Sequence, residues 1–246
     1  MLVQPSHPGN VGACARAMRV MGLHDLCLVS PRVPEAPRHP DAVAFASGAT
    51  DVLERCRIVD SLEAALAQVT LVVGVSAETR EFGPTPEPPE EAAARVLMEL
   101  DADSRHRVAL VFGPERTGLS IQDVARCQAL CSIPGDTEYS SLNLAQAVQV
   151  LAYVLRRAAD ARSASPAPAE TARWASQAEI TAFFAHFERA LIAIRFLDPA
   201  HPKKLMARMR RLFGRTRLES EEVQLLRGVC KQAELAARGE LPSRHD

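Results

Sequence analysis

The chain has 246 residues, of which 47% are hydrophobic and 24% charged, the composition of a folded globular protein. No stretch is apolar over the length of a membrane span, and the first residues lack the charged and apolar regions of a secretory signal. The cysteines and histidines show no paired or metal-ligand spacing, so we expect reduced thiols, a cytoplasmic protein and no metal site.

Positive charge is concentrated between Arg195 and Arg217. This segment holds eight basic residues and one acid, Asp198, whereas the whole chain carries a net charge of −1. Such a run favours contact with a polyanion, although a solvated helix face gives the same pattern.

Residues 1–158 alternate short apolar runs with amphipathic helical segments. After a short strand before Pro5, the expected strands are Leu26–Val29, Leu71–Val75, Val108–Phe112 and Ala129–Ile133. Helices are expected after Asp41, after Ser61, from Pro89 and after Ser120, which forms a capping box with Asp123. Strands without alternation, separated by helices, predict a parallel sheet covered on both faces, with ligands at the carboxyl ends of its strands.

Residues 159–175 are rich in Ala, Ser and Pro and are predicted to form a linker. Beyond it the pattern is helical. We expect one helix after the capping box of Ser176 and Glu179, with an apolar face made by Ile180, Phe183, Phe184, Phe187, Leu191 and Ile194. A basic helix (Lys203 to Phe213) and a last helix (Ser220 to Arg238, stopped by Gly239) follow. The expected domains are therefore residues 1–158 and 176–246.

The first of three polar loops runs from Pro8 to Arg16. Gly9 and Asn10 lead into a helix whose free N–H groups suit an anion, and Arg16 on its first turns is placed to grip a phosphate. A structural turn with a surface arginine explains these residues equally well.

The second loop, Val111–Leu119, is a glycine-rich turn directly after a strand, with Glu115 between two glycines. It lacks the Gly-Lys-Ser/Thr of a triphosphate-binding loop. Gly113 and Gly118 suit close backbone approach to a flat or sugar-containing ligand, and a plain strand-to-helix loop is the alternative.

The third loop follows the strand that ends at Ile133. It places Ser140, Ser141 and Asn143 at a helix start. Three polar side chains in four residues are more than one helix cap needs, which favours a binding site.

Together and in this order, these segments resemble the three signature motifs of the SpoU/TrmH group of the SPOUT methyltransferases. Residues 74–78 resemble the family's second cofactor loop. Residues 200–229 resemble the C-terminal extension of the TrmJ family of tRNA methyltransferases, which act on the first nucleotide of the anticodon loop. The resemblance implies a SPOUT-type α/β fold, a parallel sheet with a C-terminal trefoil knot, plus a small all-helical basic C-terminal domain. It also implies a homodimer, S-adenosyl-L-methionine as cofactor and tRNA as partner.

The resemblance also assigns residues. It implies cofactor contacts for Val75, Ser76, Ala77, Gly113, Ile133, Ser140, Ser141 and Leu142. It implies a reaction centre built from Arg16, Asn10, Glu115, Ser141 and Asn143. RNA contacts are expected for Arg16, Tyr139, Lys203, Lys204, Arg208, Arg210, Arg211 and Arg215.

The implied reaction is 2′-O-methylation of a tRNA ribose, that of cytidine or uridine at position 32. The same chemistry on ribosomal RNA, or a non-catalytic RNA-binding protein of this fold, are the alternatives. In the family dimer, the first-motif arginine reaches the partner's cofactor. Because a guanidinium stays protonated and has no acceptor, we expect Arg16 to clamp the adjacent phosphate and stabilise the developing alkoxide.

Overall fold

The computed structural model describes residues 1–76, 83–136, 138, 141–162 and 173–240. Within these residues, seven parallel strands form one sheet in the order β3-β2-β1-β6-β4-β7-β5. The strands are β1 (Leu2–Val3), β2 (Cys27–Val29), β3 (Arg57–Val59), β4 (Leu71–Val75), β5 (Pro86–Glu87), β6 (Val108–Phe112) and β7 (Ala129–Cys131). The predicted parallel α/β sheet is confirmed.

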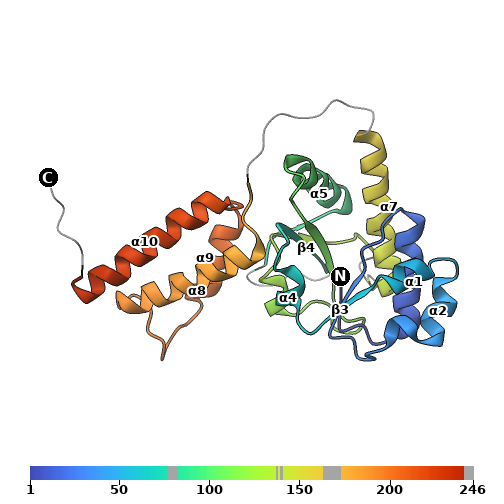
Figure 1. The fold of residues 1–246 in the computed structure, drawn as a ribbon, viewed down its shortest axis with the longest axis horizontal. Helices are drawn as coiled ribbons and strands as arrows, with labels where there is room; N and C mark the ends of the chain where they lie inside the picture. The colour runs from blue at the N-terminus through green and yellow to red at the C-terminus, as the bar shows by residue number, and fades with distance from the viewer. Residues whose placement is uncertain (77–82, 137, 139–140, 163–172, 241–246) are drawn as a thin grey trace.

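Helices surround this sheet and continue into a separate C-terminal group (Figure 1). Around the sheet lie α1 (Pro8–Val20), a 3-10 turn (Ala36–Arg38), α2 (Pro40–Ala46), α3 (Thr50–Glu54), α4 (Leu62–Leu66), α5 (Pro89–Ala102), α6 (Ile121–Val124) and α7 (Leu144–Arg162). The C-terminal group consists of α8 (Gln177–Ala193), α9 (Leu205–Gly214) and α10 (Ser220–Arg238).

Both faces of the sheet are buried. Leu71 and Val73 of β4 belong to a core cluster shared with α1, α5 and α7, whereas Val72 between them belongs to a second cluster shared with α4 and α6. Successive strand residues point to opposite faces. A strand covered on both faces therefore reads as a continuous apolar run, as the sequence predicted.

The strands at the two edges of the sheet were not predicted. β4 and β6 have the predicted bounds, β2 starts one residue late at Cys27, and β7 stops at Cys131 instead of Ile133. β3 and β5 lie at the edges, where one strand is largely exposed and the other contains Pro86. Edge strands need little apolar surface and tolerate proline, so no apolar run marks them.

Most predicted helix starts are confirmed by their caps. Ser61 caps α4, and Ser120 with Asp123 forms the capping box of α6. The start after Asp41 was wrong, because α2 begins at Pro40. There the His39 ring accepts a hydrogen bond from the Asp41 N–H at 3.2 Å, and proline is tolerated at the first helical position.

The C-terminal helices have a core of their own. Phe183 of α8, fully buried, packs edge-on against Phe213 of α9 with ring centroids 5.2 Å apart. The bounds of α10 match the prediction, and α9 begins two residues later than expected. Ile194, predicted for the apolar face, follows the end of α8 and is 46% exposed.

Both ends of the expected linker are built into the fold. α7 continues to Arg162, and the backbone N–H of Ala175 donates to Leu218 O at 2.9 Å. The Gln177 N–H donates to Val69 O at 2.8 Å, which attaches the start of α8 to the α/β part. No helix in the described part of the chain is both long and apolar enough to cross a membrane.

Candidate functional site

A cavity of about 290 Å³ lies at the carboxyl ends of β4, β6 and β7. These strands are neighbours in the sheet, so the loops that leave them meet at one edge. The cavity is lined by Val75, Ser76, Phe112, Gly113, Pro114, Glu115, Arg116, Thr117, Gly118, Ile133, Ser141, Leu142, Leu144 and Ala147. The loops that follow β4, β6 and β7, far apart in the sequence, therefore form one concave site with both polar and apolar lining residues.

Most of the residues predicted to contact a cofactor line this cavity. They are Val75, Ser76, Gly113, Ile133, Ser141 and Leu142. Ala77 and Ser140 lie outside the described residues, as does Tyr139. The cavity also takes in Phe112, Thr117 and Ala147, which the sequence analysis did not single out.

The glycine loop after β6 closes on itself. A side chain at Gly113 would overlap the backbone of Gly118 and Leu119. Gly118 has a φ of +62°, the left-handed region that favours glycine, and its N–H donates to Pro114 O at 2.9 Å. The first glycine is thus required by contacts within its own loop, and not only by close approach to a ligand as predicted.

A chain of hydrogen bonds joins all three polar loops beside the cavity. The Asn10 side-chain NH₂ donates to Glu115 Oε1 at 3.0 Å, and the Asn143 NH₂ donates to Asn10 Oδ1 at 3.2 Å. The Glu115 carboxylate also accepts from the Ser6 N–H at 3.1 Å and from the Ser6 hydroxyl at 2.9 Å. Residues that are 105 and 133 positions apart are held in one network.

Glu115 is the acceptor on which this network converges. Its partial burial opposes ionisation, but hydrogen bonds from Asn10, the Glu115 backbone and Ser6 outweigh burial and lower the pKa of the carboxyl group. The carboxylate therefore stays charged at neutral pH and holds the first loop against the second. Ser6 was not predicted, and no sequence pattern marks it, since only the fold brings it to Glu115.

Asn143 has two structural tasks besides its contact with Asn10. Its Oδ1 accepts from the Ala145 N–H at 2.9 Å, and its own N–H donates to Gln146 Oε1 at 3.1 Å. These bonds satisfy N–H groups at the start of α7. Ser141 lines the cavity and is exposed. The third loop thus provides both a helix cap and a polar wall of the site.

Arg16 is not brought to this cavity within one chain. It is exposed on α1 and borders a shallow depression with Phe45, Gln149 and Val150. Arg16 forms no hydrogen bond or ion pair with the side chains that the structure describes. Of the five predicted reaction-centre residues, Asn10, Glu115 and Asn143 are joined to one another, Ser141 lines the cavity, and Arg16 lies apart.

The predicted RNA-binding residues of the C-terminal helices face two directions. Arg210, Arg211 and Arg215 line a pocket against the α/β part. A different depression is bordered by Lys203, Lys204 and Arg208. The described residues contain no cluster of three or more potential metal ligands.

Comparison with known proteins gives two family matches that together span most of the chain. The model of the SpoU rRNA Methylase family matches residues 1–153. The model of the tRNA methyltransferase TrmJ C-terminal domain matches residues 178–242.

Full-length relatives agree with these matches. The chain is 45% identical to tRNA (cytidine/uridine/adenosine-2′-O-)-methyltransferase TrmJ of Pseudomonas aeruginosa, over 97% of this chain and 94% of that protein. It is 42% identical to tRNA (cytidine/uridine-2′-O-)-methyltransferase TrmJ of Klebsiella pneumoniae, over 97% of both. The crystal structure of TrmJ from Zymomonas mobilis superimposes with a TM-score of 0.79 at 32% identity, covering 95% of this chain and 97% of that one. The chain therefore belongs to the SpoU rRNA Methylase family, and its C-terminal helices belong to the TrmJ C-terminal domain family.

Proposed function

We propose that this protein transfers a methyl group from S-adenosyl-L-methionine to the 2′-oxygen of a tRNA ribose. The observation that carries the proposal is the cavity at the carboxyl ends of β4, β6 and β7, joined to the first loop through Glu115 and Asn10. The 2′-O-methyltransferase names of the P. aeruginosa and K. pneumoniae relatives support tRNA cytidine or uridine as the target. Position 32 rests on the resemblance of residues 200–229 alone.

The cavity suits the cofactor. Apolar side chains such as Val75, Ile133 and Leu142 line the cavity together with residues of the glycine loop. This combination suits an adenosine held by shape and by main-chain hydrogen bonds. The cofactor supplies an electrophilic methyl group, and the chain's own task is to hold the acceptor hydroxyl in line with it. Because Gly113 has no side chain, the backbone of the second loop can approach a ligand in the cavity. Ser76 and Ser141 line the cavity with hydroxyl groups.

The hydrogen-bond chain fixes the acceptor side of the site. With Glu115 charged and fully engaged by Asn10 and Ser6, it orders the loop that precedes α1 and does not serve as a free base. Asn143, held by Asn10 and by the start of α7, is positioned to orient the ribose together with Ser141. The proton of the hydroxyl leaves to phosphate or water.

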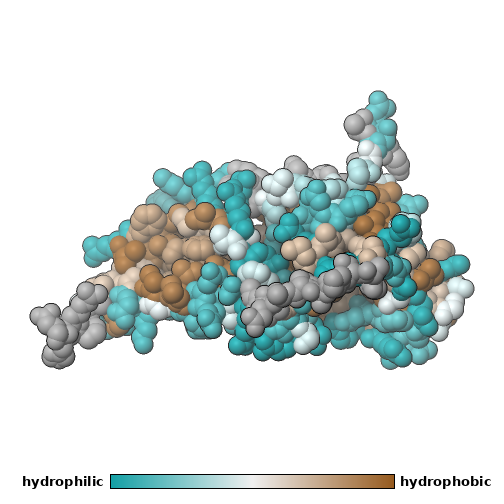
Figure 2. Space-filling model, turned by 90° about the horizontal axis from the view of Figure 1, so that it is seen from above, coloured by the Kyte–Doolittle hydropathy of each residue, from teal (hydrophilic) through white to brown (hydrophobic). Residues whose placement is uncertain are grey.

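Arg16 lies away from the cavity of its own chain, so it can act in methyl transfer only at the cavity of a second chain. It lies on an exposed face of α1, α2 and α7 whose apolar members include Val20, Phe45 and Tyr153, which are 68%, 59% and 50% exposed. Figure 2 shows small apolar areas at the α/β end of the molecule and a broader one over the C-terminal helices. An apolar face of this kind suits an isologous homodimer in which Arg16 of one chain clamps the phosphate beside the partner's cofactor.

We also infer a trefoil knot and a two-domain organisation. The knot is supported by β7, which lies between β4 and β5, and by the return of the following segment to Asn10 of the first loop. The division at the expected linker is supported by a Bordetella pertussis probable methyltransferase, 48% identical, that matches 64% of this chain and 92% of its own length, with a TM-score of 0.61. A cytoplasmic location is supported by six cysteines that are all free.

The test uses the purified full-length protein with tRNA and ribosomal RNA as separate substrates. We expect S-adenosyl-L-methionine to bind in calorimetry, and 2′-O-methylated cytidine or uridine to appear in nuclease digests of tRNA but not of ribosomal RNA. Asn10→Ala should lower the methylation rate without changing cofactor affinity, because Asn10 does not line the cavity. Cofactor binding without methylation of any RNA would refute the proposal and favour a non-catalytic RNA-binding protein.

A further inference from the structure

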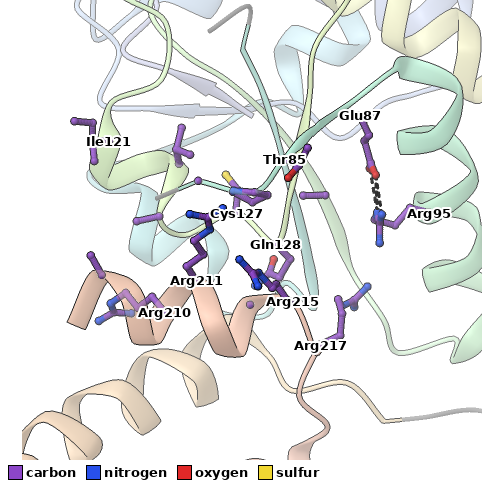
Figure 3. Close-up of a pocket in the computed structure, with 17 residues that line it drawn as sticks. Thr85, Glu87, Arg95, Ile121, Cys127, Gln128, Arg210, Arg211, Arg215 and Arg217 are labelled. Carbon is purple, nitrogen blue, oxygen red and sulfur yellow. Dashed lines mark hydrogen bonds and ion pairs between the residues drawn. The ribbon is translucent and has the colours of Figure 1, made fainter. Parts of the chain in front are cut away.

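A second pocket lies between the C-terminal helices and the α/β part, away from the cavity described above. Its volume is about 420 Å³. One side is formed by α9, and the other by residues 83–87, α6 and the segment that leads into β7. Figure 3 shows Arg211 and Arg215 rising from α9 toward Gln128 and Cys127. The two halves of the chain therefore share one concavity that neither makes alone.

The pocket holds more positive than negative charge. Five arginines and one carboxylate line it. Arg95 is neutralised by Glu87, with N–H···O distances of 2.7–3.2 Å, and Arg217 is neutralised by Glu99 at 2.5 Å. The other three, Arg210, Arg211 and Arg215, form no ion pair with a carboxylate among the residues that the structure describes, although Glu188 lies close enough to Arg210 to favour its charge.

This excess is not what a contact between domains requires. A guanidinium remains charged in a protein, and Arg211 and Arg215 are exposed, so solvent screens their charges and leaves both side chains accessible to an anion. Arg210 is the most enclosed of the three and lies 4.4 Å from the centre of the Phe184 ring. Burial, with a smaller effect from Arg126, lowers the pKa of Arg210. The side of α9 that lines the pocket is thus a cationic surface whose arginines form no ion pair within the described part of the chain.

The side of the pocket opposite the α9 arginines includes apolar residues, and α9 leaves room. Ile121, Val124 and Ala129 line the wall, and Ala207 and Gly214 are the small residues on α9 that line it. A Cβ atom at Gly214 would meet no heavy atom within 4 Å. The pocket is therefore larger than a single phosphate needs, and its apolar wall suits a flat ring.

Gln128 adds a donor of fixed orientation. Its side-chain oxygen accepts from the Val72 N–H at 2.8 Å, so its NH₂ group is the end that remains for a ligand. Thr85 lines the same pocket with a hydroxyl. Cations for a phosphate, an apolar wall for a base and an amide for its edge together match the chemistry of one nucleotide.

We propose that this pocket binds one nucleotide of the RNA substrate, with its phosphate on Arg211 and Arg215 and its base against Ile121. The proposal rests on the proposed function only in taking the nucleotide from RNA; a free nucleotide has the same chemistry. It separates two roles within the basic segment. Lys203, Lys204 and Arg208 border another depression and contact phosphates at the surface, whereas the pocket holds a nucleotide turned out of the strand.

The test compares the full-length protein with three variants. Arg211→Gln/Arg215→Gln removes the two pocket charges. Arg227→Gln/Lys231→Gln removes the same charge from α10, outside the pocket. Gly214→Leu adds an apolar side chain at a residue that lines the pocket without changing its charge, and its Cβ would meet no heavy atom within 4 Å.

Cytidine 5′-monophosphate, followed by calorimetry, is the first probe, with cytidine as the phosphate-free control. We expect wild type and the α10 variant to bind the nucleotide and to prefer it to cytidine. The two pocket variants should each bind it at least tenfold more weakly. Equal binding by all four proteins, or no binding by wild type, would overturn the site.

A tRNA transcript titrated at several salt concentrations identifies the source of the nucleotide. Log affinity falls as log salt rises, and loss of one phosphate contact should make this negative slope shallower by about 0.7–0.9 in the Arg211→Gln/Arg215→Gln protein. An unchanged slope with lost nucleotide binding would overturn the RNA assignment and make a free nucleotide the ligand. Cofactor affinity, measured in the same variants, should not change. A protein that fails to bind cofactor but still binds the nucleotide would refute the proposed function and leave this pocket standing.

Discussion

The contact between Arg217 and Glu99 should decide whether the C-terminal helices stay attached to the α/β part. Arg217 Nη2 lies 2.5 Å from Glu99 Oε2, and the Glu99 side chain is 0% exposed while that of Arg217 is 18% exposed. Glu99 Oε1 has no hydrogen-bond partner among the described residues and lies 3.5 Å from Nδ1 of the buried His106, so Arg217 is the permanently charged group that neutralises the carboxylate. Arg217→Met would leave the buried carboxylate with the His106 ring as its remaining ionisable neighbour among the described residues.

The expected cost follows from the burial. Removing one partner of a buried ion pair costs about 3–5 kcal/mol, and the partial exposure of Arg217 places this pair near about 3 kcal/mol. The double variant Glu99→Gln/Arg217→Met has no charge left to bury and should recover most of the loss. Arg215→Met, an exposed arginine two positions away, is the matched control and should change the free energy of unfolding by no more than about 0.5 kcal/mol.

Urea unfolding followed by tryptophan fluorescence measures this contact directly. Trp174 is the single tryptophan of the chain, and the Arg217 guanidinium carbon lies 5.0 Å from the centre of its ring. With a urea dependence of about 1–3 kcal/mol per molar, Arg217→Met should move the midpoint down by about 1–3 M. An unchanged midpoint, or a double variant as unstable as the single one, would refute the assignment of the stability to the ion pair.

Three further outcomes test the site. Because hydrogen bonds lower the pKa of Glu115, its charge stabilises the fold above the unfolded value of about 4.3, and this stability is lost as the pH falls through the folded-state pKa. The difference in urea midpoint between wild type and Glu115→Gln should therefore shrink from pH 7 to pH 3.5, and a constant difference would contradict this reading. Gly113→Ala should cost about 3 kcal/mol or more of stability without cofactor, since its methyl group overlaps loop backbone, whereas Gly48→Ala has open space. Finally, Arg16→Ala and Ser141→Ala chains should each be nearly inactive, yet co-expressed mixed dimers isolated with two affinity tags should recover about half of the wild-type activity per dimer. Mixed dimers no more active than their parents would rule out a site shared between chains.

The central strands, most helix starts and the three loops of the site could be predicted from the amino-acid sequence. Each leaves a signal within a short stretch of the sequence. The apolar run of β4 reflects burial on both faces, and the capping boxes at Ser120 and Ser176 satisfy N–H groups within one helical turn. Because parallel strands place their carboxyl ends at one edge, the position of the loops also followed from the strand pattern.

Tertiary structure alone decided which distant groups meet. Ser6 contacts Glu115, 109 positions away, and Arg217 contacts Glu99 across 118 positions, and no local pattern encodes either pair. The tertiary structure also gives the basic segment three different environments. Arg217 pairs with Glu99, a second group of arginines lines the pocket, and the remaining basic residues border a separate depression. The physical reason is that a sequence shows where the arginines are but not which carboxylates the fold places beside them. Whether a guanidinium is neutralised by a carboxylate or left to bind a ligand depends on what the fold places opposite it.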